Sequence, residues 1–165
     1  MITTAINPSP LRRLASSLGL LFQRPPRQQI AALCYRQHKG RVEVLLITTR
    51  NTKRWIIPKG WPGSKRTAAK TASIEAYEEA GIIGKVANQP LGEYLSHKGL
   101  GNGFTVRTNV IVFPLKVSEQ VAEFPERGER QHRWLSPEKA AELCGEDGLR
   151  DILLSPEVKS LLMAA

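Results

Sequence analysis

The 165-residue sequence is poor in cysteine and has no long apolar run. Its two cysteines, Cys34 and Cys144, are too few for a disulfide scaffold, and their apolar surroundings predict buried, reduced thiols in a cytoplasmic protein. No apolar run approaches the roughly 18 residues that a membrane-spanning helix needs, so we expect no integral membrane association. Hydrophobic residues make up 41% and charged residues 24%, which excludes a wholly disordered chain.

Acidic residues are almost missing from the first 74 positions, which hold 14 basic side chains and one acid, Glu43. Residues 75–165 hold 10 basic and 14 acidic side chains, so a net charge of +13 is followed by one of −4. A basic half beside a carboxylate-bearing half is typical of a protein that binds a polyanion, with a cation between the two. Charge alone leaves open a nucleic acid, a membrane surface, a phosphorylated small molecule and an ordinary solvated surface.

The chain divides into an extension and one domain. Residues 1–26 contain four prolines and no acid, and we expect them to be poorly ordered. In residues 27–165 the hydrophobic patterns predict the order β-β-β-α-β-β-β-α-α, which favours an α+β fold with helices packed on a mixed sheet. The expected strands cover residues 29–35, 42–48, 55–57, 91–97, 105–117 and 133–135, and the expected helices cover 67–80, 136–144 and a segment from 155.

Three glutamates, Glu75, Glu78 and Glu79, fall on one face of the expected helix over residues 67–80. Like charges at these spacings repel by a few tenths of a kcal/mol per pair, roughly, and the helix offers no Lys or Arg at the right offsets. A divalent cation would offset this repulsion, and hard carboxylate oxygens suit Mg²⁺, with Mn²⁺ as the alternative. A solvated acidic helix face is the other interpretation of the same pattern.

The segment before this helix is strongly basic and contains two glycines, Gly60 and Gly63. A basic, glycine-containing loop that leads into a helix with three carboxylates can hold a phosphate chain bridged to metal ions. It is neither a P-loop nor a GxGxxG loop, because neither pattern occurs here. Its seven basic residues, with no acid among them, are Arg50, Lys53, Arg54, Lys59, Lys65, Arg66 and Lys70.

Residues 60–82 resemble the Nudix box, GX5EX7REUXEEXGU. Two positions depart from it, because Arg66 replaces the first Glu and Ile74 replaces the Arg; we hypothesise that packing of Ile74 replaces a bracing ion pair. The segments around the box, over about residues 27–145, resemble the diphosphoinositol polyphosphate phosphohydrolase branch of the family. The matching box positions are Gly60, Glu75, Glu78, Glu79, Gly81 and Ile82.

The resemblance implies an α/β/α sandwich and a Mg²⁺-dependent hydrolase. Nudix enzymes hydrolyse a phosphoanhydride bond in a nucleoside diphosphate, or another diphosphate, linked to a further group. By the same resemblance Glu75 and Glu79 would bind the metal, with the backbone carbonyl of Lys59 as a further ligand. Glu78 would be the catalytic proton acceptor or a ligand of a second metal ion.

The resemblance also suggests how a polyphosphate is held. Basic residues matched to the phosphohydrolase branch would hold outer phosphates, and two threonines would add hydroxyl contacts. Many Nudix proteins have, downstream of the box, a further glutamate that binds metal or acts as a general base. Glu126 or Glu129 could have this role, although we expect both to lie in a surface loop. Trp61, in the polar loop, could stack on a base. The expected phosphate-binding residues are Arg27, Thr48, Thr49, Arg50 and Arg107.

Three functions remain open at this point. The basic segment favours a polyphosphorylated small molecule as the partner, such as a diadenosine polyphosphate or a diphosphoinositol polyphosphate. Pyrophosphate removal from an RNA 5′ end would use the same box and the same basic surface. A Nudix-like binding module without catalysis is the third possibility, which only the departures at Arg66 and Ile74 support. The sequence leaves the oligomeric state open.

Overall fold

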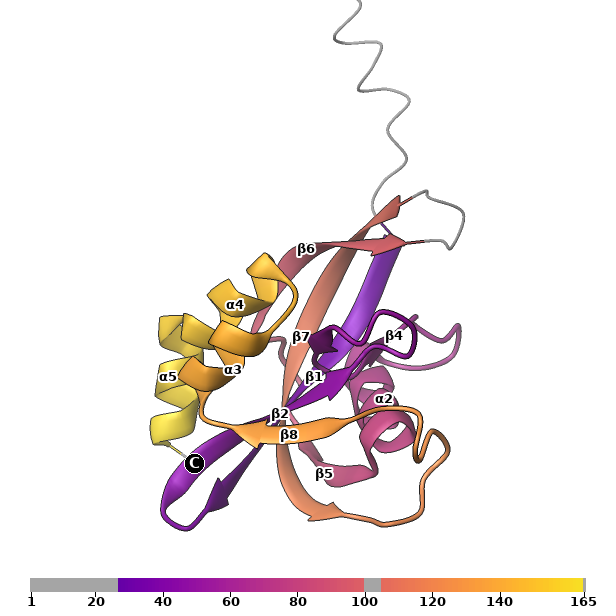
Figure 1. Cartoon of the computed structure of the whole chain (residues 1–165). Helices are drawn as coiled ribbons and strands as arrows, with labels where there is room; N and C mark the ends of the chain where they lie inside the picture. Colours follow the sequence, from indigo (N-terminus) through magenta and orange to yellow (C-terminus); the bar gives the residue numbers. More distant parts are fainter. Residues whose placement is uncertain (1–26, 100–104, 165) are drawn as a thin grey trace, which may run out of the picture.

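The computed structural model describes residues 27–99 and 105–164, which are built around a mixed eight-stranded β-sheet (Figure 1). Its strands are β1 (Arg27–His38), β2 (Arg41–Thr48), β3 (Trp55–Ile56), β4 (Lys59–Gly60), β5 (Ile82–Val86), β6 (Gly92–Gly99), β7 (Thr105–Gln120) and β8 (His132–Leu135). Five of them follow the order β3-β2-β1-β7-β5, while β4 pairs with β1, β6 with β7 and β8 with β2. Strands β1 and β7 run parallel, and the other pairs are antiparallel.

Helix α2 (Ala68–Ala80) covers one face of the sheet. It begins after Thr67, whose hydroxyl accepts a hydrogen bond from the Lys70 amide at 3.2 Å, and it ends at Gly81 with a left-handed φ of 67°. The small side chains on its inner face let the helix lie close to the strands, which brings its glutamates near the sheet edge. These buried alanines are Ala72, Ala76 and Ala80.

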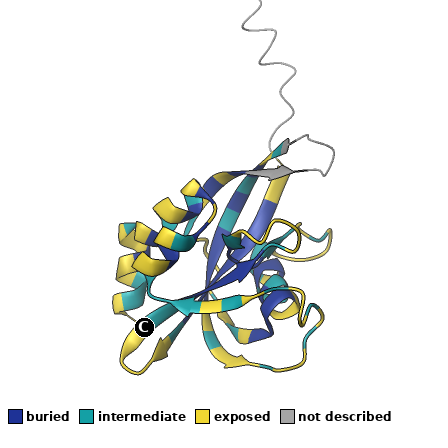
Figure 2. Cartoon of the chain, viewed as in Figure 1, coloured by how far each residue is buried: buried dark blue, intermediate teal, exposed yellow. Residues whose placement is uncertain are grey.

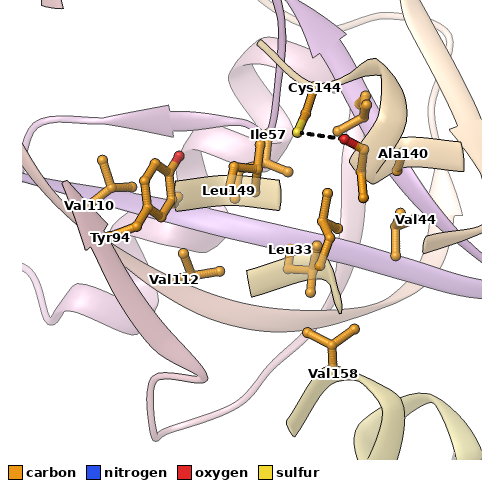
Figure 3. Close-up of a cluster of buried hydrophobic side chains, with 14 of the residues drawn as sticks. Leu33, Val44, Ile57, Tyr94, Val110, Val112, Ala140, Cys144, Leu149 and Val158 are labelled. Carbon is orange, nitrogen blue, oxygen red and sulfur yellow. Dashed lines mark hydrogen bonds between the residues drawn. The ribbon is translucent and has the colours of Figure 1, made fainter. Parts of the chain in front are cut away.

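Helices α3 (Pro137–Leu143), α4 (Asp147–Leu154) and α5 (Pro156–Met163) cover the opposite face (Figure 1). Alternation along β1 divides the core between the two faces. Leu33 contributes to the cluster under α3, α4 and α5, together with Val110 and Leu149 (Figure 3), whereas its neighbours Ala32 and Cys34 pack toward α2. Buried residues therefore lie on both faces of the central strands, which Figure 2 shows as largely buried, and the expected α/β/α sandwich is confirmed.

Most expected elements are present, with three additions. The two-residue strand β4 is too short for a hydrophobic pattern to reveal. Strand β5 contains Gly84 and a register shift between Ile83 and Gly84, which obscure its alternation. Helix α4 was not predicted because its N-cap residue is Glu146, which is not a typical capping residue. The Glu146 side chain makes no capping hydrogen bond to α4 and instead pairs with Lys59.

Residues 1–26, expected to form the extension, lie outside the described residues, so the predicted boundary at residue 27 stays a prediction. Within residues 27–99 and 105–164, no helix combines the length and the hydropathy required to traverse a bilayer.

Candidate active site

A cleft of about 480 Å³ lies where β4, the loop of residues 49–54 and α2 meet. Its wall combines cations and carboxylates in equal number, beside neutral residues such as Gln29 and Ser96. The charged residues that line it are Arg50, Arg54, Lys59, Arg130, Glu75, Glu79, Glu126 and Glu146. A cleft of this composition suits a ligand that carries several negative charges together with a cation.

The helix α2 directs two of its three box glutamates into the cleft. Glu75 and Glu79 line it, and Glu79 is only 6% exposed. Glu78 is exposed and does not line the cleft. Because successive helical residues are separated by about 100°, positions 75 and 79 nearly coincide, whereas 78 and 79 point apart. The three carboxylates therefore share the expected helix face but are not equivalent, because two of them line the cleft and Glu78 is exposed.

Strand β4 contacts both cleft carboxylates. The Lys59 amide donates a hydrogen bond to Oε2 of Glu79 at 3.0 Å. A Cβ atom on Gly60 would collide with the Glu75 carboxyl group, so a larger residue at position 60 would displace that carboxylate from its present place. The glycine of the box is thus explained by close approach rather than by backbone conformation.

The cation that compensates this acidic group is Arg130, which the sequence did not indicate. Its guanidinium pairs with Oε1 of Glu79, donates to Oε2 of Glu126 at 2.8 Å and to the Thr48 carbonyl at 3.0 Å. Its side chain is 6% exposed. Arg130 follows β7 in a loop 51 residues beyond Glu79, so a search for a cation on the helix itself could not find it.

Negative charge in this group remains under-compensated. Burial raises the pKa of Glu79 to about 7, and Glu126 and Glu75 add to the rise, although Arg130 and the Lys59 amide oppose it. Burial also raises the pKa of Glu75, with further contributions from Glu78 and Glu126. Carboxylates in this state are suitable ligands for a hard divalent cation. Among the described residues, however, no three His, Cys, Asp or Glu side chains already form a metal-ligating group.

The cleft wall also contains a second buried carboxylate, Glu146. Its two oxygens accept hydrogen bonds from Nζ of Lys59 at 2.7 and 2.9 Å, and it also accepts from the hydroxyls of Tyr94, at 2.8 Å, and Ser96. Burial alone would raise the pKa of Glu146, but Lys59 and the two hydroxyls hold that pKa below its ordinary value. This carboxylate is fully satisfied inside the protein.

The expected phosphate-binding residues separate into two groups. Thr49 and Arg50 line the cleft, and Arg50 lies 3.7 Å from Glu126 and 3.3 Å from Glu129. Thr48 does not line it, because its buried hydroxyl accepts a hydrogen bond from the Gln131 amide. The predicted role of Thr48 is therefore not supported.

The other two expected phosphate-binding residues, Arg27 and Arg107, are exposed and do not line the cleft. Arg27 pairs in register with Thr108, so it shares a sheet face with Gln29 and Ser96 of the cleft wall. Arg107 precedes Thr108 and so points to the opposite face. The structure does not bring Arg107 to the cleft, which corrects that expectation.

The two departures from the box, Arg66 and Ile74, differ in their exposure to solvent. Arg66 is exposed, and its charge lowers the pKa of Glu75 among larger opposing influences. Ile74 is half-buried and belongs to neither of the two hydrophobic clusters of the described residues. The hypothesis that Ile74 packs into the core in place of an ion pair is thus not supported.

The Nudix domain family matches residues 25–155. The chain belongs to the Nudix hydrolase family. Members of this family cleave pyrophosphate bonds. The family resemblance predicted from residues 60–82 is confirmed.

Individual Nudix relatives are moderately similar. Nudix hydrolase 12, mitochondrial, from Arabidopsis thaliana is 36% identical over 113 residues, which cover 64% of this chain and 53% of that protein. The chain thus spans about half the length of this relative. Diphosphoinositol polyphosphate phosphohydrolase 3-alpha from Homo sapiens is 33% identical over 60 residues, which cover 36% of this chain and 37% of that protein. The cytoplasmic location expected for this chain stays a prediction.

A solved structure of the C. elegans Ap4A hydrolase binary complex superposes with a TM-score of 0.62 at 17% identity, covering 84% of this chain and 99% of that one. At this identity the likeness shows the Nudix fold alone.

Proposed function

We propose that the cleft binds Mg²⁺ and hydrolyses a phosphoanhydride bond in a nucleoside diphosphate linked to another group, or in a related polyphosphorylated molecule. The observation that carries this proposal is the pair Glu75 and Glu79, which are held against β4 with raised pKa values. Arg130 is shared with Glu126 and leaves part of their charge uncompensated. A divalent cation is the partner that such a pair lacks.

The proposed ligands are Glu75, Glu79 and the backbone carbonyl of Lys59. When bound, Mg²⁺ would supply charge neutralisation at the phosphates and would make the attacking water more acidic. Glu126 lines the cleft beside this group and is better placed than the exposed Glu78 to accept a proton. Glu78 is retained as the alternative acceptor, or as a ligand of a second ion.

The proposed substrate carries several adjoining phosphates. Arg50 and Arg54 contribute positive charge to the cleft wall, and Thr49 adds a hydroxyl group. Trp61 is 41% exposed in the same wall and is proposed to stack on a nucleobase. The human relative is named for diphosphoinositol polyphosphates and the nematode structure for Ap4A, so both substrate types are proposed here.

A phosphate-release assay of the full chain tests this proposal. Dinucleoside polyphosphates, sugar nucleotides, inositol pyrophosphates and RNA with a 5′-triphosphate would each be supplied with Mg²⁺ and, separately, with a chelator. We expect release from at least one of the first three classes, and none with the chelator. Release from RNA alone would assign the enzyme to RNA 5′ ends. Tight binding of these compounds without release would support the non-catalytic module instead.

A further inference from the structure

Lys59 contacts both groups of buried carboxylates in the cleft wall. Its amide donates to Glu79, its ammonium group pairs with Glu146, and its neighbour Gly60 lies directly against the Glu75 carboxyl group. Strand β4 consists of these two residues and pairs with β1 only at Ile30 and Ala31. So short a strand has few backbone hydrogen bonds of its own, although the Ala32 amide of β1 also donates to the Pro58 carbonyl just before it, at 2.9 Å. Side-chain contacts can therefore contribute to holding this strand in place.

Glu146 supplies such a contact from a well-fixed segment. The Gly145 amide donates to the Trp55 carbonyl at 2.8 Å, which ties this segment to β3. A Cβ atom on Gly148 would come within 2.6 Å of Tyr94, so α4 lies directly against β6 at this point. The side chains of Lys59 and Glu146 are only 10% and 7% exposed, so their ion pair is buried.

We propose that Glu146 is a positioning residue that acts through Lys59. It holds the Lys59–Gly60 backbone against Glu79 and Glu75 and so fixes the geometry of the proposed metal ligands. The expected effect on metal binding rests on the proposed function, whereas the expected effect on the position of the Lys59–Gly60 backbone does not. The positioning role also accounts for the absence of a capping hydrogen bond from Glu146 to α4, because the carboxylate is turned toward Lys59 instead.

The structural content can be tested without metal. Amide hydrogen exchange of the full chain in a chelator would be measured by NMR for wild type and Glu146→Gln, with Glu43→Gln as the matched control. Glu43 forms an ion pair with Arg36 at 2.8 Å on the β1–β2 hairpin, and neither residue lines the cleft. We expect exchange at the Lys59 amide to rise about 10-fold or more in Glu146→Gln only, while core amides such as that of Val44 change little.

The consequence for the metal is measured by Mn²⁺ affinity, with Mn²⁺ alone as the probe. Loss of a residue that orients a ligand costs about 10- to 100-fold in affinity, so we expect Glu146→Gln to weaken Mn²⁺ binding by at least about 10-fold. Glu43→Gln should leave it unchanged. A wild-type protein that binds no Mn²⁺ would refute the proposed function, while the exchange measurement would still decide the positioning role.

A double variant separates positioning from simple charge pairing. Replacing both partners by apolar residues, Lys59→Met with Glu146→Leu, removes two buried charges together. Because the Tyr94 and Ser96 hydroxyls then lose their acceptor, we expect this variant to restore only part of the thermal stability that Glu146→Gln loses. We expect Mn²⁺ affinity and turnover to remain low in this variant. Full recovery of both, or unchanged exchange at Lys59 in Glu146→Gln, would overturn the proposal.

Discussion

Glu79 and Glu146 are both buried carboxylates in the cleft wall, and both pair with a buried cation, yet their pKa values shift in opposite directions. Glu146 accepts hydrogen bonds from the Lys59 ammonium and from two hydroxyl groups, and these contacts lower its pKa. Glu79 shares Arg130 with Glu126 and lies near Glu75, and its pKa rises to about 7. We infer from this difference that Glu146 has a structural role, whereas Glu79 is the proposed metal ligand.

The two groups of carboxylates in the cleft wall therefore have different proposed tasks. Glu146 is paired with Lys59 and two hydroxyl groups and is proposed to hold β4 in place. The group with Glu75 and Glu79 would gain stability on binding the proposed divalent cation, because the charge of these carboxylates would then be offset. Each prediction below tests one part of this assignment.

The largest expected effect comes from Glu79→Gln. Loss of one ligand charge should lower turnover by about 100-fold or more, while circular dichroism shows a retained fold. Glu78→Gln serves as the matched neighbour on the exposed helix surface, and its loss should be at least about 10-fold smaller. Near-normal turnover in both variants would end the metal-hydrolase proposal.

A smaller loss is expected from Gly60→Ala. The new methyl group would collide with the Glu75 carboxyl group and displace it, so turnover should fall about 10-fold or more, with weaker Mg²⁺ dependence. Gly63→Ala is the control in the same loop, because its methyl group would meet only the flexible Arg66 side chain at 3.3 Å. Equal turnover in the two variants would show that Glu75 is not held by β4 in the active form.

The arginines distinguish the cleft from the rest of the basic surface. A charged hydrogen bond to phosphate contributes about 1.5–3 kcal/mol, so Arg50→Gln should raise KM by at least about 10-fold, most for the longest phosphate chains. Arg107→Gln should leave KM within about 2-fold, because Arg107 points to the other face of the sheet. Steady-state kinetics on substrates of increasing phosphate number provide the measurement. Equal effects of the two substitutions would contradict the placement of the cleft.

The smallest effect concerns the two departures from the box. Because Ile74 is half-buried and lies outside both clusters, Ile74→Arg should lower the free energy of unfolding by only about 1 kcal/mol. Arg66→Glu should recover part of that loss if the new side chains meet. A double-mutant cycle by urea denaturation measures this coupling, and a large loss without recovery would show that Ile74 is packed more tightly than the structure indicates.

The sequence predicted the elements that carry local signals. Thr67, the alanine stripe and Gly81 define α2 through capping and periodicity, and the box glutamates follow from their positions on it. The charge partners could not be found in this way. Arg130 pairs with Glu79, 51 residues away in the chain, and Glu146 pairs with Lys59, 87 residues away. Both Arg130 and Glu146 lie in segments without a periodic pattern. Arg107 was misplaced because its face depends on the register of β7 with β1 and β6.

The most direct test of the account is the titration of the Glu79 and Glu146 carboxyl groups by NMR, with and without Mg²⁺. A bound cation favours the ionised carboxylate, so saturating Mg²⁺ should lower the pKa of Glu79 from about 7 to below its ordinary value. The already lowered pKa of Glu146 should not change. A Glu79 titration that is the same with and without Mg²⁺ would contradict the central claim that this carboxylate is left for a metal ion.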